Sequence, residues 1–104
     1  MLLFKKKFLP AIRRGEKTQT IRLWKHRRMR PGQRSYIPGI GAIRILAVDE
    51  VRLGELTDKD AHLDGFDTAD NLRAEIEQLY ADRLASGCKA FRILFELESA
   101  EQEN

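Results

Sequence analysis

In residues 42–53 the side chains alternate in the pattern of a long β-strand, and no other feature limits the possible folds of the chain as much. One face would carry Ile43, Ile45, Ala47, Asp49 and Val51, and the other Arg44, Leu46, Val48, Glu50 and Arg52. Because successive side chains of a strand point to opposite faces, the stretch predicts one long strand that is apolar near its middle on both faces. We therefore expect a sheet with other elements packed against it.

The rest of the chain predicts shorter elements around this strand. Strands are predicted at 2–4, 18–24, 35–38 and 89–97, and a short helix at 8–14. Thr57 and Asp60 form a capping-box pattern for a helix that should end at Gly65. A second helix, capped by Asp67 or Thr68, should run to Gly87, with apolar residues at helical spacing: Leu72, Ile76, Leu79, Tyr80 and Leu84. This order predicts an α+β fold, a small, mostly antiparallel β-barrel with helices packed outside.

The length and composition suggest one domain. We place it at residues 1–98 of the 104, followed by a polar, flexible C-terminal tail at 99–104. The single cysteine, Cys88, excludes an internal disulfide and fits a reducing compartment. No apolar run is long enough to span a bilayer, and the N-terminus has too few apolar residues for a signal peptide. We therefore expect a cytoplasmic protein without a membrane partner.

No sequence pattern points to a metal or a cofactor. The two histidines, His26 and His62, lie far from Cys88 in sequence and match no zinc-ligand spacing. The chain has no Walker loop, no dinucleotide fingerprint and no Ser-His-Asp order. We therefore expect a function that uses neither a metal nor a cofactor.

Positive charge is concentrated in the first third of the chain. Residues 1–34 contain twelve Lys or Arg and one acid, a formal charge of +11, whereas 35–104 contain seven basic and fifteen acidic residues, a charge of −8. The densest part is a predicted loop that holds Lys25, Arg27, Arg28, Arg30 and Arg34. Such a distribution is typical of a surface that meets an anionic partner such as RNA. Alternatively, the two halves neutralise each other in the fold and the loop is only solvated.

Residues 15–22 place an amine, two hydroxyls and a guanidinium close together. In a strand, one face would carry Thr18, Thr20 and Arg22, and the other Gln19, Ile21 and Leu23. Arg22 suits capture of a carboxylate or phosphate, or alternatively a cross-strand ion pair. Lys17 and Thr20 could take part in catalysis, or be a surface lysine and a β-forming threonine. Trp24 suits base stacking or a place in the core.

The segment Gly15-Glu16-Lys17-Thr18-Gln19-Thr20-Ile21-Arg22 resembles the Gly-x-Lys-x-x-Thr-x-Arg signature of the ASCH domain, a branch of the PUA-like barrels. The similarity extends through the Arg-Pro-Gly-Gln turn at 30–33, the block at 57–66 and the closing strand around 91–95. It implies a PUA-like β-barrel with a cleft beside the signature. Members of this family are thought to bind or act on RNA, nucleotides or modified nucleosides.

One small bacterial branch of that family is an amidohydrolase that removes acetyl from acetylcytidine with a lysine, a threonine and a glutamate. By motif position, the resemblance assigns these roles to Lys17, Thr20 and Asp64, where aspartate is shorter than glutamate by one methylene. To activate Thr20, Lys17 needs a lowered pKa, which neighbouring arginines favour and Asp64 opposes. A separation of the Asp64 carboxylate from the Lys17 amine well beyond hydrogen-bond reach would favour binding over catalysis.

Three functions remain open at this point. The first is binding of RNA, a nucleotide or a modified nucleoside, with these candidate ligand-binding residues: Arg14, Thr18, Arg22, Trp24, Lys25, Arg27, Arg28 and Arg30. The second is an amidohydrolase that deacylates a cytidine-type nucleoside, in which Thr20 attacks, Lys17 activates it and Asp64 assists. The third is a protein-interaction module whose basic face meets an acidic protein.

Overall fold

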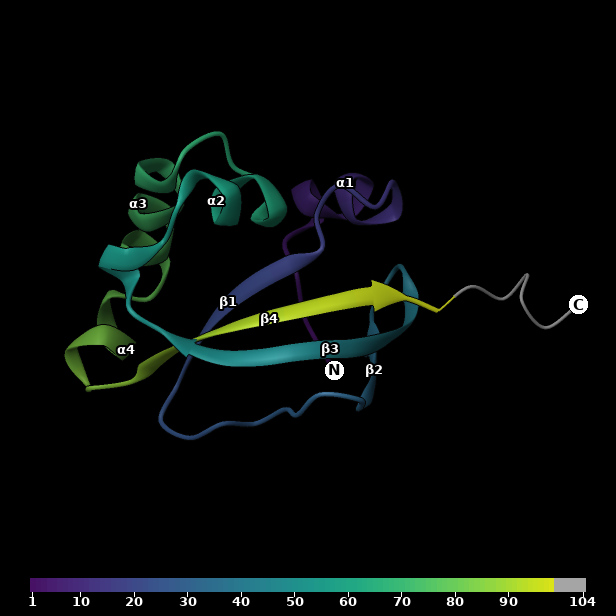
Figure 1. Cartoon of the computed structure of the whole chain (residues 1–104), viewed down its shortest axis with the longest axis horizontal. Helices are drawn as coiled ribbons and strands as arrows, with labels where there is room; N and C mark the ends of the chain where they lie inside the picture. Colours follow the sequence, from purple (N-terminus) through teal and green to yellow (C-terminus); the bar gives the residue numbers. More distant parts are fainter. Residues whose placement is uncertain (99–104) are drawn as a thin grey trace, which may run out of the picture.

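The computed structural model describes residues 1–98, and the tail predicted at 99–104 lies outside the described residues. The elements, in chain order, are α1 (Leu9–Arg13), β1 (Gln19–Trp24), β2 (Arg34–Ile37), β3 (Gly41–Val51), α2 (Asp58–Asp64), α3 (Ala69–Leu79), α4 (Ala81–Ala85) and β4 (Lys89–Leu97). Two short 3-10 turns, Lys6–Phe8 and Leu53–Glu55, lie before α1 and α2. Figure 1 shows these elements in one small α+β unit.

The four strands form one antiparallel sheet in the order β1-β4-β3-β2. The C-terminal strand β4 therefore lies in the interior of the sheet, where it pairs with β1 on one side and β3 on the other. The long β3 also pairs with β2 near its start, so the sheet curls into a half-barrel (Figure 1). The α+β class and the mostly antiparallel sheet are confirmed.

β3 contains an irregularity that changes which of its side chains face the core. The register with β4 shifts between Ile45 and Ala47, as expected where one extra residue enters a strand. Before the shift Ile43 and Ile45 are buried, and after it Val48 joins the same core cluster. Leu46, at the shift, is 48% exposed. Leu46 therefore lies on the exposed face with Arg44, and the shift brings Val48 instead of Ala47 to the buried face of Ile43 and Ile45.

The buried side chains form two clusters around the sheet. The first is centred on β3 and β4, where Ile43, Ile93 and Phe95 are buried. The second is formed by β1 together with α2 and α3, and its buried members include Ile21, Leu23, Leu56, Leu72 and Ile76. Burial of this apolar surface supplies the main driving force that holds the helices against the sheet. The predicted helical spacing of Leu72 and Ile76 is confirmed.

Two element predictions differ from the structure. Residues 2–4 do not form a strand, because their backbone groups find separate partners: the Leu2 amide donates to the Tyr36 carbonyl at 2.9 Å, and the Leu3 carbonyl accepts from Arg22. The helix predicted up to Gly87 is interrupted at Tyr80, whose φ of −123° and ψ of 26° lie outside the helical region. α3 ends there and α4 begins.

The first predicted cap is confirmed in detail. The Thr57 hydroxyl accepts from the Asp60 amide, and the Asp60 carboxylate accepts from the Thr57 amide, so both groups of the capping box are in place. α2 ends at Gly65, whose φ of 93° is the left-handed conformation that glycine adopts without strain. Asp64 is thus fixed as the last residue of α2.

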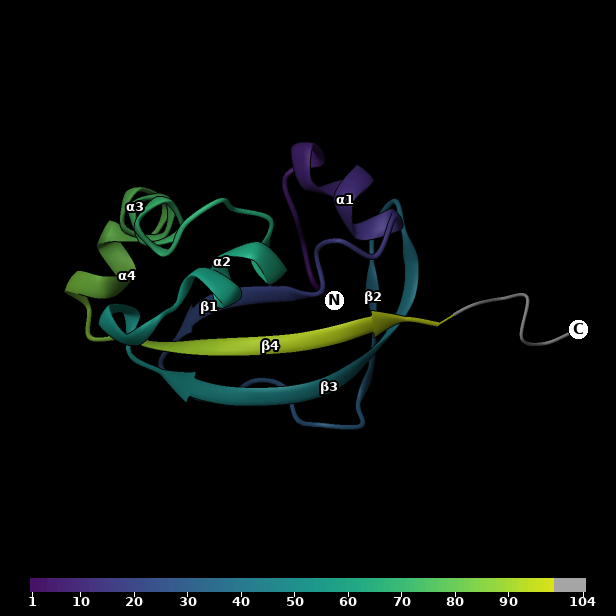
Figure 2. The same ribbon diagram turned by 45° about the horizontal axis from the view of Figure 1, so that its top comes forward.

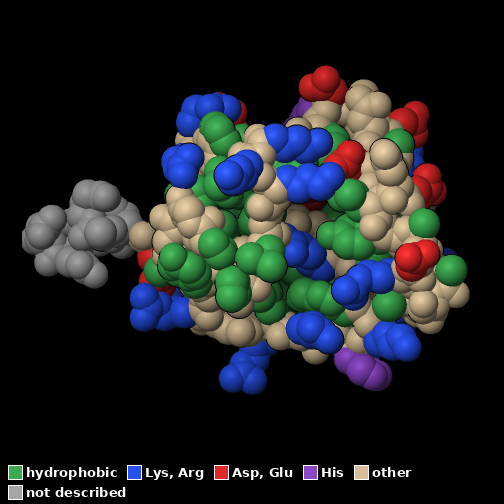
Figure 3. Space-filling model, turned by 180° about the vertical axis from the view of Figure 1, so that it is seen from behind, with side chains coloured by type: hydrophobic (Ala, Val, Ile, Leu, Met, Phe, Trp, Pro, Cys, Tyr) green, Lys and Arg blue, Asp and Glu red, His purple; other side chains and the backbone are tan. Residues whose placement is uncertain are grey.

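The helices lie over one side of the curled sheet. Figure 2 shows α2, α3 and α4 gathered above the strands at one end and α1 above the other end. The segment before α1 passes between these two groups of helices. From behind, Lys and Arg side chains are spread between hydrophobic ones, and acidic side chains gather toward the end where α3 and α4 lie (Figure 3). Within residues 1–98, no helix has the length and apolar character needed to cross a membrane.

Candidate functional site

Backbone hydrogen bonds bring the signature at 15–22 against the end of α2. Gly15, with a φ of 76°, turns the chain out of α1. The Thr18 amide then donates to the Leu63 carbonyl at 2.9 Å, and the Thr18 carbonyl accepts from the Phe95 amide of β4 at 3.0 Å. The segment between α1 and β1 is therefore tied on both sides. This connection places Lys17 beside Asp64, although 47 residues separate them in the sequence.

Lys17 and Asp64 form a buried ion pair. The Lys17 ammonium nitrogen Nζ lies 2.8 Å from Asp64 Oδ1, and the two side chains are only 2% and 6% exposed. Lys17 Nζ also donates to the Gln19 carbonyl at 3.1 Å and to the Asp64 backbone carbonyl. The second carboxylate oxygen, Oδ2, accepts from Gln19 Nε2 at 3.3 Å. Three acceptors around Nζ match the three protons of an ammonium ion, so the geometry favours the charged pair.

Burial and mutual attraction act in opposite directions on this pair. Burial lowers the pKa of Lys17 below its ordinary value, because the charged amine loses its hydration, and the nearby Asp64 carboxylate opposes that shift. Burial likewise raises the pKa of Asp64, whereas Lys17, Gln19 and Arg22 pull it down. Burial thus brings the two pKa values closer together, whereas the three hydrogen bonds around Nζ hold the pair in its charged form.

Thr20 and Arg22 occupy the adjacent part of β1. The Thr20 side chain is buried, and its Oγ1 accepts a hydrogen bond from Arg22 Nε at 3.1 Å. Arg22 Nη2 donates to the Leu3 carbonyl at 2.7 Å, and the guanidinium lies over the Phe4 ring at 4.8 Å. The Thr20 hydroxyl keeps its own proton available for a ligand or a base. Among residues 1–98, no hydrogen bond joins Lys17 to Thr20.

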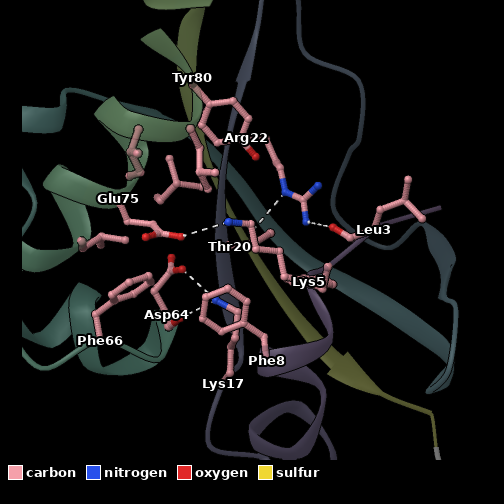
Figure 4. Close-up of a pocket in the computed structure, with 15 residues that line it drawn as sticks. Leu3, Lys5, Phe8, Lys17, Thr20, Arg22, Asp64, Phe66, Glu75 and Tyr80 are labelled. Carbon is pink, nitrogen blue, oxygen red and sulfur yellow. Dashed lines mark hydrogen bonds and ion pairs between the residues drawn. The ribbon is translucent and has the colours of Figure 1, made fainter.

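Lys17, Thr20, Arg22 and Asp64 line one cavity of about 200 Å³. Figure 4 shows them around this space, with Phe8 and Phe66 beside the ion pair and with Glu75 and Tyr80 reaching in from the side of α3. The wall residues come from the N-terminal segment, β1, α2 and α3: Leu3, Phe4, Lys5, Phe8, Ile21, Phe66, Leu72, Glu75, Ile76, Leu79 and Tyr80. A largely apolar cavity with a few polar groups is the usual form of a small-ligand site.

Sequence reasoning missed several of these wall residues. Phe4 and Phe8 come from a segment that carried no motif, and both rings lie near Lys17 Nζ, at 5.6 and 4.7 Å. Glu75 lies on α3 between the buried Leu72 and Ile76. The sequence offers one indication that Glu75 lies near the cavity: it follows Leu72 by three residues, and side chains at that spacing share a helix face.

The other predicted binding residues lie outside this cavity. Arg14 pairs with Glu16 at 2.9 Å at the surface. Thr18 contributes to a separate recess with Arg14. Arg30 is exposed.

The basic loop after β1 contains one arginine that the fold anchors by a hydrogen bond. Trp24 packs on Phe91, with 5.5 Å between the ring centroids, and Arg27 lies over the same ring and donates to the Val48 carbonyl. Lys25, Arg27 and Arg28 are all exposed, but within residues 1–98 Arg27 alone of the three makes a side-chain hydrogen bond. Lys25 and Arg28 line, together with Trp24, His26, Arg83, Ser86 and Cys88, a further recess of about 370 Å³, here called the basic recess. Arg27 is thus held by the fold, whereas Lys25 and Arg28 remain available to a ligand.

Residues 1–98 contain no group of three or more His, Cys, Asp or Glu side chains placed to hold a metal ion. The polar groups that Lys17, Asp64, Thr20 and Arg22 present to the cavity are an amine, a carboxylate, a hydroxyl and a guanidinium.

Comparisons with known proteins identify the fold. No family model and no curated protein match the sequence. The structure is similar to the crystal structure of the hypothetical protein PH0355, with a TM-score of 0.74 and 15% identity over 90% of this chain and 94% of that one. It is also similar to protein EF3133 from Enterococcus faecalis V583, described under DUF984, with a TM-score of 0.65 and 17% identity over 84% and 67% of the two chains. These similarities show that the chain has a fold already seen in small α+β proteins.

Proposed function

We propose that the protein is an ASCH-like amidohydrolase that removes an acyl group from the exocyclic amine of a cytidine-type nucleoside. The observation that carries the proposal is the 2.8 Å contact between Lys17 Nζ and Asp64 Oδ1, in the wall of a cavity that Thr20 also lines. A buried amine, carboxylate and hydroxyl that converge on one small cavity suit acyl transfer. The resemblance of residues 15–22 to the ASCH signature points to the same chemistry.

Four side chains take part in the proposed reaction. Lys17 first passes a proton to Asp64, and the resulting neutral amine takes the proton of the Thr20 hydroxyl. Thr20 Oγ1 attacks the acyl carbon, the C–N bond breaks, and the leaving amine takes up the proton that Lys17 holds. A water molecule then hydrolyses the Thr20 ester, which releases the carboxylic acid and restores the hydroxyl. Arg22, which already donates to Thr20 Oγ1, stabilises negative charge on that oxygen.

The size and lining of the cavity favour a small, flat ligand. Its volume of about 200 Å³ is below the range of roughly 300–1,000 Å³ for drug-sized ligands. Phe4, Phe8, Phe66 and Tyr80 supply aromatic surface, on which a nucleobase can stack. A single base with its acyl group fits this description better than a folded RNA does.

Turnover of N4-acetylcytidine, followed by chromatography of cytidine and acetate, tests the proposal. We expect hydrolysis by the wild type and a loss of at least about a hundredfold in Lys17→Ala and Thr20→Ala. Lys59→Ala is the matched control, because Lys59 is exposed on α2. Full activity in Lys17→Ala or Thr20→Ala, or no turnover by the wild type, would refute the assignment.

RNA binding is a second candidate function, which the basic recess favours. Lys25, Arg28 and Arg83 surround Trp24 there, an arrangement of cations beside an aromatic ring that suits a nucleic-acid strand. Contacts to phosphates release counterions, so the affinity for single-stranded RNA should fall as salt rises. Replacing Lys25 or Arg28 with alanine should reduce the log-log salt slope by about 0.7 for each lost contact. A slope near zero in the wild type would contradict this candidate.

A further inference from the structure

Glu75 is a pocket residue to which the proposed reaction gives no role. It lies on α3 between Leu72 and Ile76, which anchor that helix in the core. Its side chain is 21% exposed and points into the cavity from α3 (Figure 4). No motif of the sequence includes it.

The Glu75 carboxylate has unused hydrogen-bonding capacity. Among residues 1–98, its buried Oε2 accepts no hydrogen bond. The nearest cations are Lys5 Nζ and Lys7 Nζ, each at 3.7 Å, which is beyond hydrogen-bond length. These two lysines are 52% and 58% exposed. A buried acceptor without a hydrogen-bond donor is costly and rare in folded proteins. A ligand N–H can satisfy Oε2 by displacing the ammonium groups of these two exposed lysines, which do not hydrogen-bond to it.

The other polar groups of the cavity are already occupied or act as donors. Both carboxylate oxygens of Asp64 accept hydrogen bonds, one from Lys17 and one from Gln19. Thr20 Oγ1 accepts from Arg22. Within residues 1–98, Glu75 is therefore the cavity carboxylate with an oxygen, Oε2, that accepts no hydrogen bond and can take an N–H from a ligand in place of its lysine partners.

We propose that Glu75 determines the base specificity of the cavity by accepting a hydrogen bond from the exocyclic N–H of a cytosine-type base. This inference rests on the proposed function, because it places a nucleoside in the cavity. A carboxylate is the acceptor that side-chain recognition uses for cytosine N4–H. Uracil carries a carbonyl oxygen at that position. Because both that oxygen and a carboxylate are hydrogen-bond acceptors, they repel each other and form no hydrogen bond. Glu75 thus selects amino and amide bases over keto bases, and it holds the nitrogen that leaves during hydrolysis.

Equilibrium binding of cytidine and uridine, measured by titration calorimetry, tests the inference without turnover. We expect the wild type to bind cytidine more tightly than uridine, by about tenfold or more, the factor that a hydrogen bond to a charged group contributes. In Glu75→Gln, the neutral amide can turn either its carbonyl or its NH2 toward the base, so the ratio of the two dissociation constants should fall close to one. Glu77→Gln is the matched control. Glu77 is exposed on the same helix, and its replacement by glutamine removes the same negative charge.

The outcomes separate this inference from the proposed function. If the wild type binds neither nucleoside, both are overturned. If the wild type binds cytidine selectively and Glu75→Gln keeps the ratio, only the role of Glu75 is overturned. If Glu75→Gln weakens both ligands equally, Glu75 serves to anchor Lys5 and Lys7 and the inference is also overturned. Should Glu75→Gln fail to fold, Glu75→Asp, which withdraws the carboxylate by one methylene, carries the same test.

Discussion

Replacement of Lys17 by methionine removes half of the buried ion pair with little change in side-chain volume. The variant leaves the Asp64 carboxylate buried, with Gln19 Nε2 at 3.3 Å as its remaining side-chain donor. Removal of one partner of a buried pair costs about 3–5 kcal/mol, because the other charge stays desolvated without compensation. A domain of this size has a total stability of about 5–15 kcal/mol. Lys17→Met should therefore lose a large part of its free energy of unfolding.

The pH dependence identifies the cause of this loss. Without Lys17, the pKa of Asp64 rises further above its ordinary value of 3.8, so the folded state keeps a proton that the unfolded state has released. The free energy of unfolding of Lys17→Met should therefore decrease as pH rises from about 4 toward neutrality. In Asp64→Asn, the pKa of the buried Lys17 falls further below 10.5, and the unfolded state binds more protons. The stability of that variant should increase as pH rises toward 10.

Urea denaturation monitored by Trp24 fluorescence at several pH values measures both effects. We expect a drop in the unfolding midpoint for each single variant at pH 7, with opposite pH slopes for the two. The double variant Lys17→Met/Asp64→Leu removes both charges and should recover most of the loss, because an apolar pair of similar volume is often as stable as a buried ion pair. A loss below about 1 kcal/mol, typical of exposed pairs, or pH slopes of the same sign, would refute the reasoning.

Three further outcomes follow from the same contacts. Gly65→Ala should lose about 1 kcal/mol or more in urea denaturation, since alanine is strained at a φ of 93°; unchanged stability would contradict the left-handed cap. Thr57→Ala should lose about 1 kcal/mol by the same assay, because the Asp60 amide loses the hydroxyl that accepts its hydrogen bond, whereas Thr57→Ser should lose much less. Arg27→Ala should lower the melting temperature, because Arg27 donates to the Val48 carbonyl, but Arg28→Ala should not, because Arg28 makes no side-chain hydrogen bond within residues 1–98; equal effects would show that the loop is not anchored at Arg27.

Much of the local structure can be predicted from the sequence, because short-range patterns determine it. The Thr57 and Asp60 pair predicts the start of α2, and Gly65 predicts its end, since capping depends on neighbouring backbone groups. The bulge in β3 is different: it depends on how Ile45 and Ala47 pair with β4, and no pattern within the strand indicates it. For that reason the burial of Val48 on the same face as Ile43 and Ile45 could not be predicted.

For the candidate site, the sequence by itself determined the chemical groups, and only the tertiary structure decided which of them meet. Residues 15–22 and Asp64 carry the amine, hydroxyl, guanidinium and carboxylate, and their types are readable from the chain. Their convergence depends on the hydrogen bond between Thr18 and Leu63 and on packing of α2 against β1. Glu75 enters the same cavity only because α3 packs there. Such long-range contacts arise from burial of apolar surface over the whole domain, which no local pattern encodes.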